Sequence, residues 1–167
     1  FLGVVPMASI DIDDEDSLSN GLDTDNIKFS NDKINIAVIR LPHISNFTDF
    51  NPLIRQKEVA LKYINDTSEI TGADLIIIPG TKNTIFDLRW LKRRGFTREA
   101  LHGKNILGIC GGFQILGHNL FDPFTVEEGG KELGLSLLHF DTVFSKEKVT
   151  RQVRANILNL PDFIMPL

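Results

Sequence analysis

The chain has 167 residues, of which 42 % are hydrophobic and 24 % charged, a composition normal for a soluble globular protein and long enough for one domain with a buried core. The net charge is −4 and no dense stripe of Lys and Arg occurs, so we expect no nucleic-acid partner. The apolar runs are shorter than the roughly 20 residues that cross a bilayer, so we expect no membrane partner. A single cysteine excludes an internal disulfide and fits a cytoplasmic protein.

Residues 1–33 differ from the rest of the chain. A short apolar run at 2–5 is followed by an acidic stretch at 11–16, and then by a segment rich in Ser, Asn, Gly and Asp up to Asp32. Such a sequence is typical of the end of one unit and a linker to the next, although a solvated acidic loop has the same composition. We therefore expect one domain over residues 34–167.

From residue 34 onward, short apolar runs alternate with helical patterns. The runs cover residues 36–39, 75–78 and 106–109, and a weaker fourth run covers residues 59–64. Continuous apolar strands that alternate with helices are typical of a parallel sheet covered on both faces. The sequence therefore predicts an α/β fold with a mostly parallel, doubly wound sheet.

One covering helix and one late strand complete the predicted elements. Residues 84–94 repeat apolar side chains at helical spacing, with Asn83 or Thr84 available as the N-cap and Gly95 after the last turn. Alternating apolar residues at 153–157 predict a late strand.

Cys110 stands where the third apolar run meets a helix that should begin at Gly111 or Gly112 and continue to about Leu120. Gly108 and Gly112 frame the cysteine as G-x-C-x-G, the spacing of a nucleophile elbow with cysteine in place of serine. Glycine suits such a turn because the backbone is strained and neighbouring chain comes close. The helix start favours the thiolate and directs the N–H of Gly111 to the place where an oxyanion would form. The alternative is that Cys110 is a buried core residue.

A second loop supports a site at Cys110. Residues 79–84, P-G-T-K-N-T, follow the run at 75–78, and open α/β sheets bind ligands at the carboxyl ends of their strands. Gly80 can turn its own N–H, or that of Thr81, toward Cys110 and complete an oxyanion hole. The same residues also suit a simple turn and helix cap. They are not a P-loop, because G-x-x-x-x-G-K-[ST] does not occur in the sequence.

Two segments together resemble the class I, or triad, glutamine amidotransferase domain: G-I-C-G-G-F-Q-I-L-G at 108–117 and I-I-P-G-T-K-N-T at 77–84. A third, R-L-P-H-I-S-N-F-T-D-F at 40–50, is similar to the start of that domain in the cobyric acid synthase family of cobalamin biosynthesis. The segments at 2–6 and 11–18 resemble the end of that family's ATP-dependent amide-ligase domain. The cysteine segment alone would also suit the cobyrinic a,c-diamide synthases.

The resemblance implies a flavodoxin-like fold and a division of labour. This domain would hydrolyse L-glutamine to glutamate and ammonia without a metal or cofactor. The ligase domain would use ATP and Mg²⁺ to activate carboxylates of a corrinoid, which the ammonia then amidates. Carried onto this sequence, Cys110 would be the nucleophile that forms a γ-glutamyl thioester, with Gly80 and Gly111 at the oxyanion hole. Gln114 would help to hold the glutamine, although it also suits the exposed face of a helix.

The sequence departs from the family at the general base, a histidine in a G-Y-E-I-H-like segment well beyond the cysteine. No such segment follows Cys110 here, and four other histidines are present. His118 is excluded, because eight residues on the same helix place it about 12 Å along the axis from Cys110. His102 is expected at the opposite end of the sheet and His43 near a domain interface. His139 is the one conceivable substitute, and we interpret it as a strand residue.

We therefore expect a chain truncated before its catalytic histidine, with little or no activity as a fragment. Two other interpretations stay open, a non-catalytic interaction module and a cysteine hydrolase of the same fold. Gln114 and the segment at 40–50 favour the glutamine-dependent interpretation over the hydrolase.

Overall fold

The computed structural model describes residues 24, 26–147, 150 and 152–154. The apolar run and the acidic stretch near the N-terminus lie outside these residues, as does most of the strand expected at 153–157. The boundary expected near residue 33 stays a prediction.

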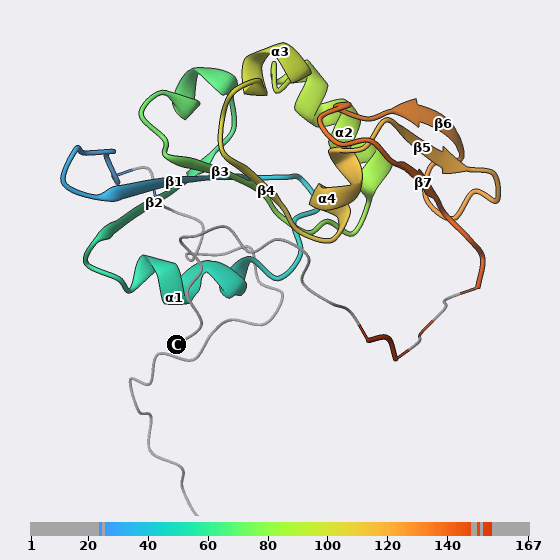
Figure 1. The fold of residues 1–167 in the computed structure, drawn as a ribbon, viewed down its shortest axis with the longest axis horizontal. Helices are drawn as coiled ribbons and strands as arrows, with labels where there is room; N and C mark the ends of the chain where they lie inside the picture. The colour runs from blue at the N-terminus through green and yellow to red at the C-terminus, as the bar shows by residue number, and fades with distance from the viewer. Residues whose placement is uncertain (1–23, 25, 148–149, 151, 155–167) are drawn as a thin grey trace, which may run out of the picture.

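Four parallel strands form the central sheet in the order β2-β1-β3-β4 (Figure 1). They are β1 (Ile34–Ile39), β2 (Val59–Ile64), β3 (Leu75–Ile78) and β4 (Ile106–Gly108). Each strand lies where an apolar run predicts one. The predicted range of the weakest run, residues 59–64, is the same as the observed range of β2. The predicted α/β fold with a parallel sheet is therefore confirmed.

The strands are mostly apolar, and helices lie on both sides of the sheet. Five of the six residues of β1 are buried. Figure 1 shows α1 (Asn51–Ile54) on one side of the sheet, and α2 (Thr84–Arg93) and α3 (Arg98–Leu101) on the other. Two 3-10 turns, η2 (Phe47–Phe50) and η3 (Thr67–Ile70), complete the connections. None of the helices in the described part of the chain is long and apolar enough to cross a membrane.

The covering helix α2 begins and ends as the sequence predicts. Asn83 is its N-cap, and the side-chain oxygen of Asn83 accepts a hydrogen bond from the N–H of Phe86 at 3.1 Å. Gly95 follows the last turn with φ +83°, a conformation that glycine adopts without a steric penalty.

The helix after the cysteine is shorter than the sequence predicts. α4 covers Gly111–Ile115 and does not reach Leu120, because β5 (Asn119–Asp122) begins there instead. The carbonyl groups of residues 115–117 accept hydrogen bonds from the backbone N–H groups of residues 135–138. Since those carbonyls are occupied by a distant segment, they do not bond a further helical turn.

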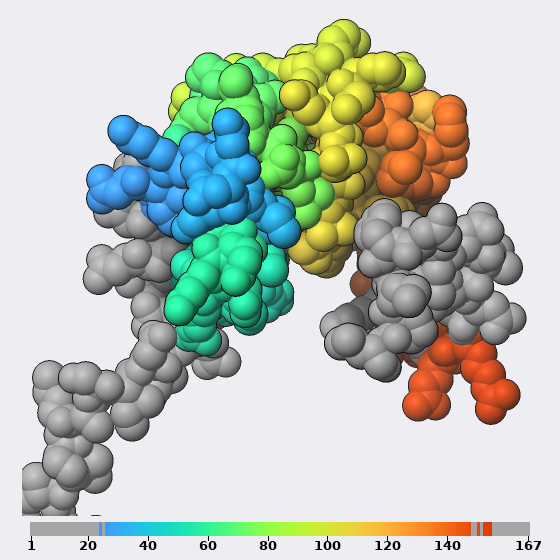
Figure 2. All heavy atoms as spheres, turned by 60° about the vertical axis from the view of Figure 1, so that its left-hand side comes forward, coloured from blue at the N-terminus to red at the C-terminus, as the bar shows by residue number. Residues whose placement is uncertain are grey.

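A second, three-stranded sheet was not predicted. Its order is β6-β5-β7, with β6 (Gly130–Leu133) antiparallel to β5 and β7 (Asp141–Val143) parallel to it. These strands have three or four residues and no continuous apolar run, so their sequence pattern is weak. Figures 1 and 2 show this sheet packed beside the segment that carries α4.

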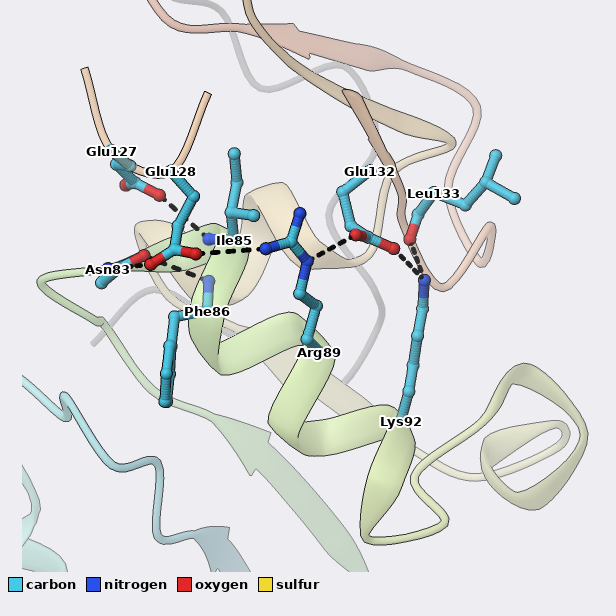
Figure 3. Close-up of polar contacts among 9 residues, drawn as sticks. All are labelled: Asn83, Ile85, Phe86, Arg89, Lys92, Glu127, Glu128, Glu132 and Leu133. Carbon is cyan, nitrogen blue, oxygen red and sulfur yellow. Dashed lines mark hydrogen bonds and ion pairs between the residues drawn. The ribbon is translucent and has the colours of Figure 1, made fainter. Parts of the chain in front are cut away.

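Ion pairs fasten the second sheet to α2, as Figure 3 shows. The Nε of Arg89 lies 2.8 Å from a carboxylate oxygen of Glu132, and its Nη1 lies 3.1 Å from one of Glu128. Lys92 pairs with the other oxygen of Glu132 at 3.0 Å. Because each glutamate comes from the β5–β6 hairpin, the network fixes that hairpin along one side of α2.

A buried carboxylate shapes the loop that carries these glutamates. Asp122 accepts hydrogen bonds from the N–H groups of Val126, Glu127 and Gly129 at 2.7, 2.8 and 2.9 Å. Burial raises the pKa of this carboxyl, but the backbone N–H donors lower it by more, so the pKa lies below its usual value. The loop then holds a carboxylate oxygen of Glu127 2.9 Å from the N–H of Ile85, in the first turn of α2.

We expect the substitution Asp122→Asn to destabilise the domain at neutral pH, because the amide loses the charge that the loop N–H groups bond. The pKa of Asp122 is lower in the folded state than the unfolded value of about 3.9. The charged carboxylate therefore contributes its full stabilisation of the fold above about pH 3.9. That contribution is lost as the pH falls through the pKa of the folded state. The deficit of the variant in unfolding free energy should therefore be larger at pH 7 than at pH 3. Urea titrations at both pH values measure it.

Asp141→Asn is the control for this experiment, because Asp141 is an exposed carboxylate of the same sheet, and Asn119 is its one side-chain partner among the described residues. It should change the unfolding free energy little at either pH. An Asp122→Asn deficit that is equal at pH 7 and pH 3 would contradict the role given to the charge.

Candidate active site

Three loops meet at the carboxyl ends of the parallel strands: residues 40–46 after β1, residues 79–83 after β3, and Cys110 after β4. β1 and β3 are neighbours, but the chain leaves β1 toward β2 on one side and β3 toward β4 on the other. Open α/β sheets bind ligands at such a switch point. The candidate site therefore lies where this fold class places sites.

Cys110 is exposed and has φ +50° and ψ −114°, in a region that side-chain-bearing residues rarely adopt. Such a conformation costs about 1–3 kcal/mol, so the surroundings must hold it. The N–H of Ile109 bonds the carbonyl of Ile78 at 3.0 Å, and the N–H of Gln114 bonds the carbonyl of Cys110 at 3.1 Å. The strained elbow that the glycine pattern predicts is present, and the alternative of a buried core cysteine is wrong.

The glycines two residues before and after Cys110 are required by close backbone contacts. A β-carbon on Gly108 would lie 2.7 Å from the Cα of Phe113. One on Gly112 would overlap the carbonyl oxygen of Ile78 and lie 2.6 Å from that of Pro79. Since these neighbours are backbone atoms, they cannot move aside without displacing a strand or a helix.

The loop after β3 lies against the elbow, as its position in the sequence predicts. A β-carbon on Gly80 would lie 3.8 Å from the Cβ of Cys110. One on Gly111 would lie 2.6 Å from the Cγ2 of Thr81 and 3.4 Å from its backbone nitrogen. The structure thus brings Gly80, Thr81, Cys110 and Gly111 together.

Gln114 lies on the same short helix as Gly111. It is half-buried, and its side-chain oxygen lies 3.4 Å from the hydroxyl of Thr84 at the start of α2. Gln114 is therefore not a fully exposed helix residue. The contact also leaves the amide NH₂ group as the part of this side chain that can donate to a ligand.

The segment at 40–50, the most specific part of the resemblance, is fastened to the loop after β3. The N–H of Ser45 donates to the carbonyl of Gly80 at 2.9 Å, and Ile44 forms an antiparallel bridge with Thr81. This segment therefore borders the site, a position that the sequence alone does not assign to it.

Sequence reasoning missed Asp87, which is fully buried in the first turn of α2. Its carboxylate accepts hydrogen bonds from the backbone N–H of His43 at 3.2 Å and from the hydroxyl of Thr81 at 2.5 Å. Its second oxygen lies 2.9 Å from the Nδ1 of His43. The only sequence signal was an acidic residue in a first helical turn, which is so common that it does not mark a site.

None of the other histidines has a contact with Cys110 among the described residues. His102 follows α3, before β4 begins, so it lies at the opposite end of the sheet from Cys110, as predicted. The Nε2 of His118 lies 3.0 Å from the Nδ1 of His139, so these two rings pair with each other. The argument from helical rise does not apply to His118, because α4 ends before it. His139 is not in a strand but in the bend before β7.

The described residues contain no cluster of three or more His, Cys, Asp or Glu side chains that could hold a metal ion. The candidate site is instead an exposed thiol at the end of β4, against which the Gly80–Thr81 loop lies. That arrangement suits acyl transfer, in which a thiolate attacks a carbonyl and N–H groups bond the oxygen.

Comparison with known proteins identifies the domain. Residues 35–163 match the model of the CobB/CobQ-like glutamine amidotransferase domain, so the chain belongs to this family. A curated relative, the cobyric acid synthase of Lachnoclostridium phytofermentans, is 49 % identical over 156 residues, which are 91 % of this chain and 30 % of the relative. The cobyric acid synthases of Caldanaerobacter subterraneus and Clostridium perfringens are 44 % and 49 % identical over 99 % and 92 % of this chain and 33 % and 32 % of the relatives. The chain spans about a third of the length of these relatives.

We expect the substitution Gly112→Ala to destabilise the domain by about 3 kcal/mol or more, because the added methyl group collides with backbone at the end of β3. Gly103→Ala is the control: no atom lies within 4 Å of its β-carbon position, but φ is +73°, so the cost should be about 1–2 kcal/mol. Urea unfolding measures both. Equal losses in the two variants would show that the backbone contact is not what requires Gly112.

Proposed function

We propose that Cys110 is the nucleophile of a glutaminase whose ammonia serves the ATP-dependent amidation of corrinoid carboxylates, as in cobyric acid synthase. The observation that carries the proposal is the exposed Cys110 at a positive φ beside Gly80, Thr81 and Gly111. The family match and the names of the relatives supply the substrate class: glutamine for this domain and a corrinoid for the whole enzyme.

The chemistry follows from this arrangement. The Cys110 thiolate attacks the γ-carbonyl carbon of glutamine and forms a tetrahedral intermediate, whose oxygen accepts hydrogen bonds from backbone N–H groups. One donor is Gly111, since the first N–H groups of a helix have no intrahelical partner, and the other comes from the Gly80–Thr81 segment. Ammonia leaves with an added proton, and water then hydrolyses the γ-glutamyl thioester to glutamate and the free thiol. Gln114 holds the substrate through its amide NH₂.

Proton transfer needs a general base, and no histidine contacts Cys110 in the part of the chain that the structure describes. His102 lies at the far end of the sheet, and His118 and His139 pair with each other. The Nδ1 of His43 is bonded to Asp87, and no contact of its Nε2 with Cys110 is present among the described residues. Because general acid–base help contributes about 10²–10⁴ in rate, the polypeptide assayed by itself should turn over glutamine slowly.

The ammonia acceptor belongs to the rest of the enzyme in this proposal. The relatives are about three times as long as this chain, which leaves room for a ligase domain that binds ATP, Mg²⁺ and the corrinoid. The level of identity, 44–49 % to several cobyric acid synthases, favours this enzyme over a cobyrinic a,c-diamide synthase.

We expect 6-diazo-5-oxonorleucine, a glutamine analogue, to label Cys110: the thiol proton passes to the diazo carbon, the sulfur bonds that carbon, and N₂ leaves. Mass spectrometry should place the adduct on Cys110, L-glutamine should protect it, and Cys110→Ser should abolish it. Iodoacetamide, which needs only an accessible thiol, is the control. Alkylation by iodoacetamide without labelling by the analogue would indicate an exposed cysteine with no glutamine pocket, as in an interaction module.

We expect the glutaminase rate of the 167-residue polypeptide to fall at least about 100-fold below that of the full-length cobyric acid synthase of Lachnoclostridium phytofermentans, measured as glutamate release. Equal rates would show that a base is present among these residues. The variants His43→Gln and His139→Gln would then identify it.

A further inference from the structure

The carboxylate of Asp87 is fully buried in the first turn of α2. It does not cap the N-terminus of this helix. In the first turn of α2, the N–H of Phe86 is bonded by the Asn83 side chain and that of Ile85 by Glu127. The carboxylate of Asp87 turns instead toward Thr81 and His43, which belong to two different loops.

The contact with Asp87 fixes the orientation of the Thr81 side chain, which lies next to Gly111. The Thr81 hydroxyl donates to Asp87 at 2.5 Å and accepts from the N–H of Asn83 at 3.0 Å. With the hydroxyl held in this way, the other branch of the side chain, Cγ2, lies against Gly111. The orientation of Thr81 relative to the elbow is therefore set by Asp87.

Backbone bonds to residues 43–45, the segment that Asp87 holds at His43, direct the peptide group between Gly80 and Thr81. Asp87 holds the backbone of His43, and two residues later the N–H of Ser45 bonds the carbonyl of Gly80. In a trans peptide the N–H points opposite to the carbonyl, so the N–H of Thr81 points away from Ser45. The Thr81 nitrogen lies 3.4 Å from the β-carbon position of Gly111, on the side of the elbow.

We propose that Asp87 is a positioning residue of the glutaminase site, which holds Thr81 so that its backbone N–H becomes the oxyanion donor contributed by the loop after β3. The inference rests on the proposed function and selects Thr81 over Gly80 as the donor on that side. Asp87 itself does not touch the substrate; it acts through the Thr81 hydroxyl and the backbone of His43.

The test compares Thr81→Val with Thr81→Ser. Valine keeps the shape of threonine but loses the hydroxyl that bonds Asp87, whereas serine keeps the hydroxyl. Alkylation of Cys110 by 6-diazo-5-oxonorleucine is resolved into a maximal rate and an apparent affinity, because the ketone oxygen of the analogue occupies the place of the oxyanion. Thr81→Val should lower the maximal rate at least about tenfold at similar affinity, which is less than the 10²–10³ lost with a complete donor. Thr81→Ser should stay within about threefold of the native protein.

Asp87→Asn should lower the maximal rate in the same direction as Thr81→Val but by less, because both donors bond one oxygen of Asp87 and a neutral amide oxygen in its place accepts them more weakly than a carboxylate. The matched control is Asp74→Asn: Asp74 also accepts from a backbone N–H, that of Asn35 at 2.7 Å, but precedes β3 at the opposite end of the sheet. It should leave the maximal rate unchanged. Urea midpoints and iodoacetamide rates of all variants separate an unfolded protein or a hidden thiol from a displaced donor.

The outcomes distinguish the two proposals. If the native protein reacts with iodoacetamide but not with the analogue, the glutaminase proposal fails and Asp87 has no site to position. If the native protein reacts with both, and Thr81→Val alkylates as fast as Thr81→Ser, the role of Asp87 is overturned while the glutaminase proposal stands. Should Asp87→Asn fail to fold, the pair of Thr81 variants decides the question by itself.

Discussion

The site depends on a contact between two stretches of backbone with no side chain between them. Gly112 packs directly on the carbonyl groups of Ile78 and Pro79, and the N–H of Ile109 bonds the carbonyl of Ile78. This contact brings the ends of β3 and β4 so close that Cys110 faces the loop that begins at Pro79. Because the neighbours are strand and helix backbone, the geometry is rigid, and the cost of the unusual conformation of Cys110 is borne by surrounding hydrogen bonds.

α2 connects the loop after β3 to the segment around His43 and to the loop between β5 and β6. Its N-terminus is held by Glu127 of the loop between β5 and β6, and by the contacts of Asp87 with Thr81 and His43. Backbone donors that are fixed before the substrate arrives need no reorganisation when charge develops on the substrate oxygen. The second sheet, which carries none of the predicted site residues, therefore contributes by fixing the helix on which the loop after β3 rests.

The errors of the sequence-based prediction share one cause, which is hydrogen bonding between distant segments. α4 ends at Ile115 because carbonyls that would continue it are taken by residues 135–138. For the same reason His118, which a longer helix would have carried, pairs with His139. Asp87 looks like an ordinary residue of a first helical turn, and only the folded chain shows that its partners are Thr81 and His43. Apolar periodicity contains no information about such contacts.

The sequence by itself determined the four strands, the bounds of α2 and the glycine-framed turn at Cys110, because burial on both faces, helix capping and backbone strain each act over a few neighbouring residues. It also placed Gly80 beside the cysteine, since parallel strands end at a common edge. Only the tertiary structure decided the length of α4, the second sheet and the pairing of the histidines. It alone also decided which way the Gly80–Thr81 peptide faces, since that direction is set by residues that meet only when the chain has folded.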